Sequence, residues 1–229
     1  MSLKPKKKSD LKKIEEKMKV KASKMESMQH LPPYTMIVSE GIKTEPIYIK
    51  GLVNKVNEKY KNATRNPHIA VYGTGRNTQG LIRFVDSMIE QGKWNHYNKF
   101  WLMYDKDDFP LDNFDNTQFE AEARKKPQMA VAWSNESIEL WFLLYFEDYC
   151  SDNGRKQYIE KLNKYFDYSK KREDLYDILN SLGSQEEAKR RARKMYAEFV
   201  DAHVTSMSAM VPATRVFELV EELESYLEK

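Results

Sequence analysis

Acidic side chains stand at the ends of two short apolar segments of this sequence. Segment 100–104 is apolar and aromatic, and Asp105 and Asp107 follow it. Segment 34–39 is also rich in strand-forming residues, and it ends at Glu40. Mg²⁺ prefers oxygen ligands such as carboxylates and keeps water and phosphate oxygens in the rest of its shell. The residue types therefore indicate metal-assisted chemistry on a phosphate group, although an Asp-rich turn is also an ordinary way to end a strand.

These carboxylates can act together only if the two apolar segments are neighbouring strands. In an open parallel sheet, ligands bind at the edge formed by the C-terminal ends of the strands. If the strands ending at Glu40 and Asp105 are adjacent, their carboxylates and that of Asp107 converge on this edge, with alternate residues on one side. Crowded carboxylates require a cation to offset their charge, and Mg²⁺, or Mn²⁺ in its place, is the expected one.

A helix is expected directly after Glu40. Gly41 permits a sharp exit from the strand, and Thr44 is expected to cap the helix, with Glu45 and Pro46 in its first turn. Spacings of three and four residues predict its buried stripe, which consists of Ile49, Leu52, Val53, Val56 and Tyr60.

The rest of the first 150 residues continues the alternation of strands and helices. Strands are predicted at 68–72 and 129–133, a helix with apolar residues from 81 to 89, and a helix at 119–125. Four strands with right-handed crossovers predict a parallel α/β sheet flanked by helices.

The polar turn 73–78 contains Gly73 and Gly75 and precedes a helix. Such a turn can bind phosphate through free backbone amides, but two glycines alone are a weak phosphate-binding motif. Arg76 in this turn and Lys43 after the first strand are the cations expected to contact a phosphate near the metal.

A buried helix is predicted from 138 to 146, where nearly every residue is apolar or aromatic. Glu139 lies inside it, and a buried carboxylate must be paired, hydrogen-bonded or bound to a metal. Two interpretations stay open: Glu139 belongs to the site together with Asn135, or it forms a structural ion pair with a buried Arg or Lys. Trp133 and Trp141 are expected to be core residues.

Four separated motifs, in this order, resemble the RloB family over roughly residues 34–223. They are Ser39-Glu40-Gly41 with Lys43-Thr44-Glu45-Pro46, Asp105-Lys106-Asp107-Asp108-Phe109, Ser134-Asn135 with Glu139-Leu140-Trp141, and Pro212-Ala213-Thr214 with the helix after it. That family resembles Toprim-fold proteins and is encoded beside bacterial restriction and abortive-infection systems. Glu136 stands where the family usually has proline, and Tyr145 stands where it often has histidine.

The residues and the resemblance together predict a Mg²⁺-dependent nuclease or phosphodiesterase that acts on DNA or RNA in phage defence. Glu40, Asp105 and Asp107 are expected to bind the metal and, with Glu139, to be catalytic. Two other functions stay open: a non-catalytic adaptor or sensor that binds RNA or a protein, and a metal-dependent nucleotidyl or phosphoryl transferase. Lys43, Arg76 and Asn135 are the expected substrate contacts.

Charge and composition, together with the resemblance to the RloB family, suggest three parts: a basic arm at 1–30, a Toprim-like α/β domain at 31–150 and a helical portion at 151–229. Residues 1–24 carry ten lysines against three acidic residues, whereas the whole chain has a net charge of only +3. Such an arm either binds polyanions by releasing counterions or is simply solvated. The expected partners are nucleic acid and other proteins of the same defence locus.

The composition also excludes several classes of protein. With a single cysteine, Cys150, the chain can form no internal disulfide, and its four histidines lack the spacing of a zinc site. No apolar run approaches the roughly 20 residues that span a bilayer, and no signal peptide is recognisable at the start, so a cytoplasmic location without membrane contact is expected.

Overall fold

The computed structural model describes residues 12–13, 15–21, 31–106 and 111–228. Residues 15–21 are helical and exposed to solvent. Asp107 and most of the lysine-rich start lie outside the described residues. The described part contains no helix that is both long and apolar enough to cross a membrane.

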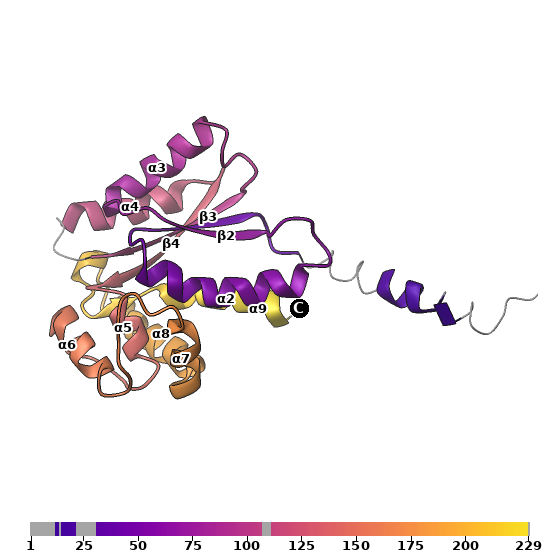
Figure 1. Ribbon diagram of the computed structural model, residues 1–229. Helices are drawn as coiled ribbons and strands as arrows, with labels where there is room; N and C mark the ends of the chain where they lie inside the picture. Colours follow the sequence, from indigo (N-terminus) through magenta and orange to yellow (C-terminus); the bar gives the residue numbers. More distant parts are fainter. Residues whose placement is uncertain (1–11, 14, 22–30, 107–110, 229) are drawn as a thin grey trace, which may run out of the picture.

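A mostly parallel sheet forms the centre of the fold (Figure 1). Its strands are β1 (Thr35–Ser39), β2 (Ile69–Gly73), β3 (Lys99–Asp105), β4 (Gln128–Asn135) and β5 (Ala213–Thr214), in the order β2-β1-β3-β4-β5. The first four strands are parallel, and β5 pairs antiparallel with β4. The predicted α/β class and parallel sheet are therefore confirmed. The two residues of β5 were not predicted, because two residues are too few to show an alternating pattern.

Helices cover both faces of the sheet, and a group of helices lies at one end of it (Figure 1). Their bounds are α2 Thr44–Tyr60, α3 Thr78–Glu90, α4 Leu111–Ala123, α5 Glu139–Leu143, α6 Gly154–Leu162, α7 Leu175–Leu182, α8 Gln185–Asp201 and α9 Val216–Glu228, with a 3₁₀ turn at Met207–Ala209. Helices α2 and α9 pack together on one face, and α3 and α4 pack together on the other. Helices α5 to α8 form the group at the end, which we call the helical lobe.

The chain leaves β1 and β3 in opposite directions across the sheet. From β1 it crosses through α2 to β2 on one side, and from β3 it crosses through α4 to β4 on the other. Adjacent strands whose connections diverge in this way leave a crevice at their C-terminal ends, where open α/β sheets bind ligands. Glu40 directly follows β1 and Asp105 ends β3, so both lie at this crevice.

Several predicted elements have different ends or contacts in the structure. The predicted stripe of α2 is buried, but Thr44 is the first helical residue and caps nothing. Its hydroxyl instead donates to the carbonyl of Lys170, 3.2 Å away. Helix α4 begins at Leu111, earlier than the predicted 119, and α5 is shorter than the predicted 138–146. Helix α7 was not predicted.

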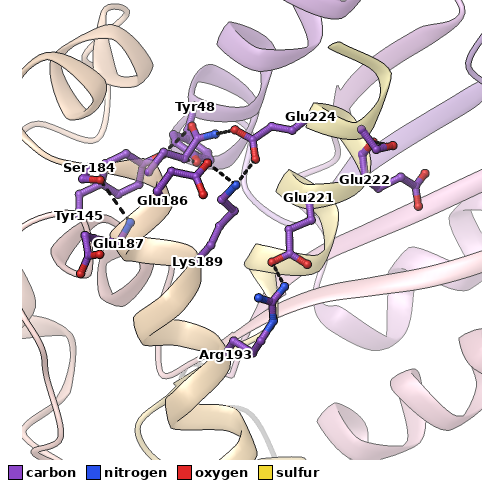
Figure 2. Close-up of polar contacts among 12 residues, drawn as sticks. Tyr48, Tyr145, Ser184, Glu186, Glu187, Lys189, Arg193, Glu221, Glu222 and Glu224 are labelled. Carbon is purple, nitrogen blue, oxygen red and sulfur yellow. Dashed lines mark hydrogen bonds and ion pairs between the residues drawn. The ribbon is translucent and has the colours of Figure 1, made fainter. Parts of the chain in front are cut away.

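The last elements of the chain return to the sheet. Helix α9 lies along α2, and the core is one continuous cluster of buried side chains. Figure 2 shows the polar contacts that join this layer to the lobe. The hydroxyls of Tyr48 and Tyr145 are 2.8 Å apart, and Tyr145 donates to Gln185, which in turn donates to Glu224. Lys189 also contacts Glu224, so the buried line of contacts ends in a half-buried ion pair.

Candidate functional site

A pocket of about 370 Å³ lies at the C-terminal ends of β1 and β3. Its acidic lining comes from Glu40, Glu45, Asp105 and Glu139, and its basic lining from Lys43, Arg155, Lys170 and Lys171. Glu40 and Asp105 lie at the ends of strands and Glu45 lies in α2, whereas Glu139 and three of the cations belong to the lobe. A pocket with both charges can hold a cation and an anion next to each other.

Glu40 is held in place by both strands and by the next helix. Its backbone N–H donates to the carbonyl of Met103 in β3, at 2.8 Å. Its Oε2 accepts a hydrogen bond of 3.0 Å from the hydroxyl of Thr78 at the start of α3. Burial raises the pKa of Glu40 to about 7, and the Thr78 hydrogen bond opposes this rise. The nearby charge of Glu45 raises the pKa further.

Glu45 organises the loop between β1 and α2. Its Oε1 accepts a hydrogen bond of 3.0 Å from the backbone N–H of Gly41. A Cβ at position 41 would lie 2.2 Å from the other carboxylate oxygen, so a larger residue there would displace the Glu45 carboxylate. Burial raises the pKa of the Glu45 carboxyl, and the charge of Glu139 adds to the rise.

Asp105 lies at the last residue of β3, level with Ser134 of β4. Its Oδ2 is 3.9 Å from a terminal nitrogen of Arg155. Burial raises the pKa of Asp105 well above its usual value, as do the charges of Glu45 and Glu139, while Arg155 opposes the rise. The carboxylates of this pocket therefore repel one another, and a bound cation would relieve that repulsion.

Glu139 is only 1% exposed and has three partners from the lobe. The hydroxyl of Tyr168 donates to its Oε1 at 2.9 Å, and Lys170 Nζ lies 3.6 Å from the same oxygen. Arg155 Nε lies 4.0 Å from the other oxygen, Oε2. Glu139 thus has cationic partners and also lines the pocket, so the structure combines features of both sequence-based interpretations.

Two predicted substrate contacts lie outside the lining of this pocket. Asn135 is the last residue of β4, and its side-chain amide donates to the carbonyls of Met207 and Ser208. Arg76 is exposed, and its guanidinium lies over the ring of Phe84, 4.9 Å from the ring centre.

The turn that contains Arg76 also offers fewer free amides than its glycines suggested. The backbone N–H groups of Thr74, Gly75 and Arg76 donate to Ser39, to Glu40 and to the Thr74 hydroxyl, respectively. These three amides are therefore engaged within the protein. Lys43, by contrast, lines the pocket as expected.

The donor set suits a hard divalent cation, although it is not a closed metal cage. Among the residues that the structure describes, no three His, Cys, Asp or Glu side chains are grouped closely enough to hold a metal ion. Mg²⁺ does not need such a group, because it is usually bound by one or two carboxylates together with water and substrate phosphates. Glu40 and Asp105 supply two carboxylates, and the predicted third ligand, Asp107, lies outside the described residues.

Comparison with models of protein families gives a match over most of the chain. The model of the RloB-like proteins matches residues 35–223. The chain belongs to the RloB-like family. No curated protein and no solved structure gives a significant match. The RloB-like match includes every residue that lines the pocket, from Glu40 to Lys171.

The pocket of this RloB-like protein also includes Arg155, Lys170 and Glu45, for which sequence analysis predicted no role in the site. Glu45 was interpreted only as a favourable acid in the first helical turn. Arg155 and Lys170 come from charged, exposed stretches that resemble any solvated helix surface. No local pattern distinguished them, because their role depends on the distant residue Glu139.

The pKa of Glu40 predicts how the stability of the metal-free protein changes with pH. A carboxyl whose pKa is higher in the folded state stabilises the fold while it is protonated, so this contribution is lost as the pH rises through about 7. In wild type we expect the free energy of unfolding to fall by about 1–2 kcal/mol from this cause, allowing for partial solvent screening. In Glu40→Gln this fall should be absent. Thermal unfolding in EDTA at pH 5 and pH 8 measures it. Between the two pH values the melting temperature of wild type should fall by about 5 °C more than that of the variant. An equal fall in both proteins would contradict this pKa for Glu40.

Proposed function

We propose that this RloB-like protein is a Mg²⁺-dependent nuclease or related phosphodiesterase that acts on nucleic acid in bacterial phage defence. The observation that carries the proposal is the pocket at the divergence of β1 and β3, where Glu40 and Asp105 lie beside several cations. A sheet edge of this kind is where α/β folds bind ligands. Oxygen donors next to cations suit a metal ion and a phosphate group together.

Glu40 and Asp105 would hold the metal, and Asp107 is the further ligand expected from the sequence. When bound, Mg²⁺ or Mn²⁺ would polarise a phosphate and lower the pKa of a coordinated water. The chain's own residues fix the geometry around it. Thr78 orients the Glu40 carboxylate, and Glu45 fixes the backbone of the loop that follows β1.

The cations at the pocket serve to bind the substrate. Lys43 and Lys171 line the pocket, and both are exposed to solvent, so they can contact a polyanionic backbone without losing their hydration. Phosphate contacts of this kind supply affinity without sequence preference. The lysine-rich residues 1–24 would add to the same non-specific attraction.

The test is a cleavage assay with the purified full-length chain. End-labelled single- and double-stranded DNA and RNA are incubated with Mg²⁺, Mn²⁺, Ca²⁺ or EDTA, each with and without the products of the neighbouring genes. We expect cleavage with Mg²⁺ or Mn²⁺ and none with EDTA. Calorimetry measures Mg²⁺ binding in parallel.

The other functions predict different results in the same assay. An adaptor would bind nucleic acid or a neighbouring gene product, but it would bind no Mg²⁺ and cleave nothing in any combination. A transferase would move a labelled nucleotide or phosphoryl group to an acceptor instead of releasing it to water. Either pattern would overturn the nuclease proposal.

A further inference from the structure

Two cations in the wall of this pocket, Arg155 and Lys170, contact the same buried carboxylate. Arg155 lies in the first turn of α6, and Lys170 lies in the connection between α6 and α7. Both line the pocket that contains Glu40 and Asp105. They are separate in sequence, yet both are within 4.0 Å of the carboxylate of Glu139.

The three side chains differ in how far they are exposed to solvent. The side chain of Glu139 is 1% exposed, whereas those of Arg155 and Lys170 are 34% and 52% exposed. The carboxylate is therefore inside the protein, and the cations it attracts lie between it and the solvent of the pocket. The hydrogen bond from Tyr168 fixes the carboxylate, which in turn restricts where the two cations can rest.

The contacts of the two cations with Glu139 are long. At 3.6 and 4.0 Å they are ion pairs and are too long to be hydrogen bonds. An ammonium group has three N–H donors and a guanidinium has five, so each kind of group can bind more than one anion at once. Guanidinium and ammonium groups are the side chains that most often bind phosphate oxygens.

We propose that Arg155 and Lys170 form a phosphate-binding pair, positioned by Glu139, that holds a phosphate group of the substrate beside Glu40 and Asp105. The inference deepens the proposed function, on which it rests for the chemistry at Glu40 and Asp105. It makes Glu139 a positioning residue in place of the catalytic residue expected from the sequence. The ligand chemistry is a phosphodiester of a nucleic acid chain.

The contact between Arg155 and Asp105 predicts opposite effects on phosphate binding and on Mg²⁺ binding. The guanidinium is 3.9 Å from Asp105 and so competes with a metal ion for the charge of this carboxylate. Removing it should weaken phosphate binding and at the same time strengthen Mg²⁺ binding. A residue that merely supported the structure of the metal site would weaken both.

The test uses Arg155→Gln and Lys170→Gln, with Lys156→Gln as the matched control. Lys156 is the next residue of α6 and does not line this pocket. Fluorescence anisotropy measures binding of labelled single-stranded 15-mers of DNA and RNA in Ca²⁺. Unlabelled inorganic phosphate and a mononucleotide serve as competitors.

We expect each pocket variant to bind the oligomers about tenfold more weakly than wild type, which corresponds to about 1.4 kcal/mol. The salt slope should fall by about 0.7 for each lost contact on a single strand. Arg155→Lys should recover part of the loss, because it restores the charge without the planar fork. Calorimetry should show severalfold tighter Mg²⁺ binding for Arg155→Gln and unchanged binding for Lys170→Gln.

Glu139→Gln tests the positioning role. The amide oxygen can still accept the hydrogen bond from Tyr168, but the attraction for both cations is lost. Oligomer binding should weaken severalfold while Mg²⁺ affinity stays within about twofold of wild type, since one hydrogen bond and the packing are kept. A large loss of Mg²⁺ affinity would make Glu139 a metal ligand and overturn the positioning role.

The remaining outcomes separate this inference from the proposed function. If Arg155→Gln and Lys170→Gln bind the oligomers as Lys156→Gln does, the phosphate-binding pair is wrong, whatever the cleavage assay shows. If wild type binds no Mg²⁺ and cleaves nothing but the two variants still lose oligomer binding, the pair stands and the nuclease proposal fails. If a mononucleotide competes as strongly as an oligomer, the phosphate belongs to a nucleotide and the nucleic-acid assignment is overturned.

Discussion

Asp105→Asn is expected to reduce metal-dependent cleavage by at least about 10³-fold, or about 4 kcal/mol in the activation free energy. The amide keeps the shape of the side chain but removes the charge that would hold the metal. The cations that we propose to bind phosphate are unchanged, so oligomer affinity in the absence of metal should stay the same or rise slightly. Single-turnover cleavage and anisotropy with the same substrate measure the two effects.

The same variant should also change stability, in a direction that is unusual for a buried substitution. Because burial and the charges of Glu45 and Glu139 raise the pKa of Asp105, its ionised form is unfavourable in the metal-free fold. Asp105→Asn should therefore melt at a higher temperature than wild type in EDTA at pH 8. Mg²⁺ should stabilise wild type but not the variant, because only a ligand that binds the folded state raises the melting temperature.

Asp201→Asn is the matched control, since Asp201 is exposed at the end of α8, away from the pocket lining. It should leave cleavage and melting unchanged. Cleavage retained by Asp105→Asn would mean that the site lies elsewhere. A lower melting temperature for this variant in EDTA would mean that Asp105 forms a favourable ion pair with Arg155.

Trp133→Ala should destabilise the fold by about 3–5 kcal/mol and lower the melting temperature by about 10 °C or more. Trp133 is 0% exposed, and its ring lies against Phe114 and Tyr196. Its indole N–H donates to the side chain of Gln118 at 2.6 Å. The substitution thus creates a cavity and leaves a buried acceptor without its donor. Urea and thermal unfolding measure the loss.

Two further variants divide this effect into its parts. Trp133→Phe keeps most of the ring but removes the donor to Gln118, and it should cost about 1–3 kcal/mol. Phe119→Ala removes an aromatic ring that is 57% exposed, so it should change stability by less than about 0.5 kcal/mol. A small effect of Trp133→Ala, with altered oligomer binding, would instead assign Trp133 to a ligand surface.

The sequence by itself predicted the four parallel strands, most of the helices and the ends of β1 and β3 as the places of two carboxylates. Strands β1 and β3 are compact apolar segments, and the stripe of α2 repeats at helical spacing, so each element is encoded within its own stretch of chain. Trp133 and Trp141 were predicted to be core residues, and both are buried. Glu40 and Asp105 could be named because each follows directly on a recognisable strand.

Tertiary structure alone decided which side chains share the pocket. Arg155 and Lys170 meet Glu139 across 16 and 31 positions of the chain, and Asn135 turns to the carbonyls of Met207 and Ser208. Such contacts have no local pattern, because they depend on how segments that are distant in sequence pack against one another. A charged residue on a solvated helix has the same sequence signature as one that faces a buried carboxylate, and only the packing of distant segments distinguishes them.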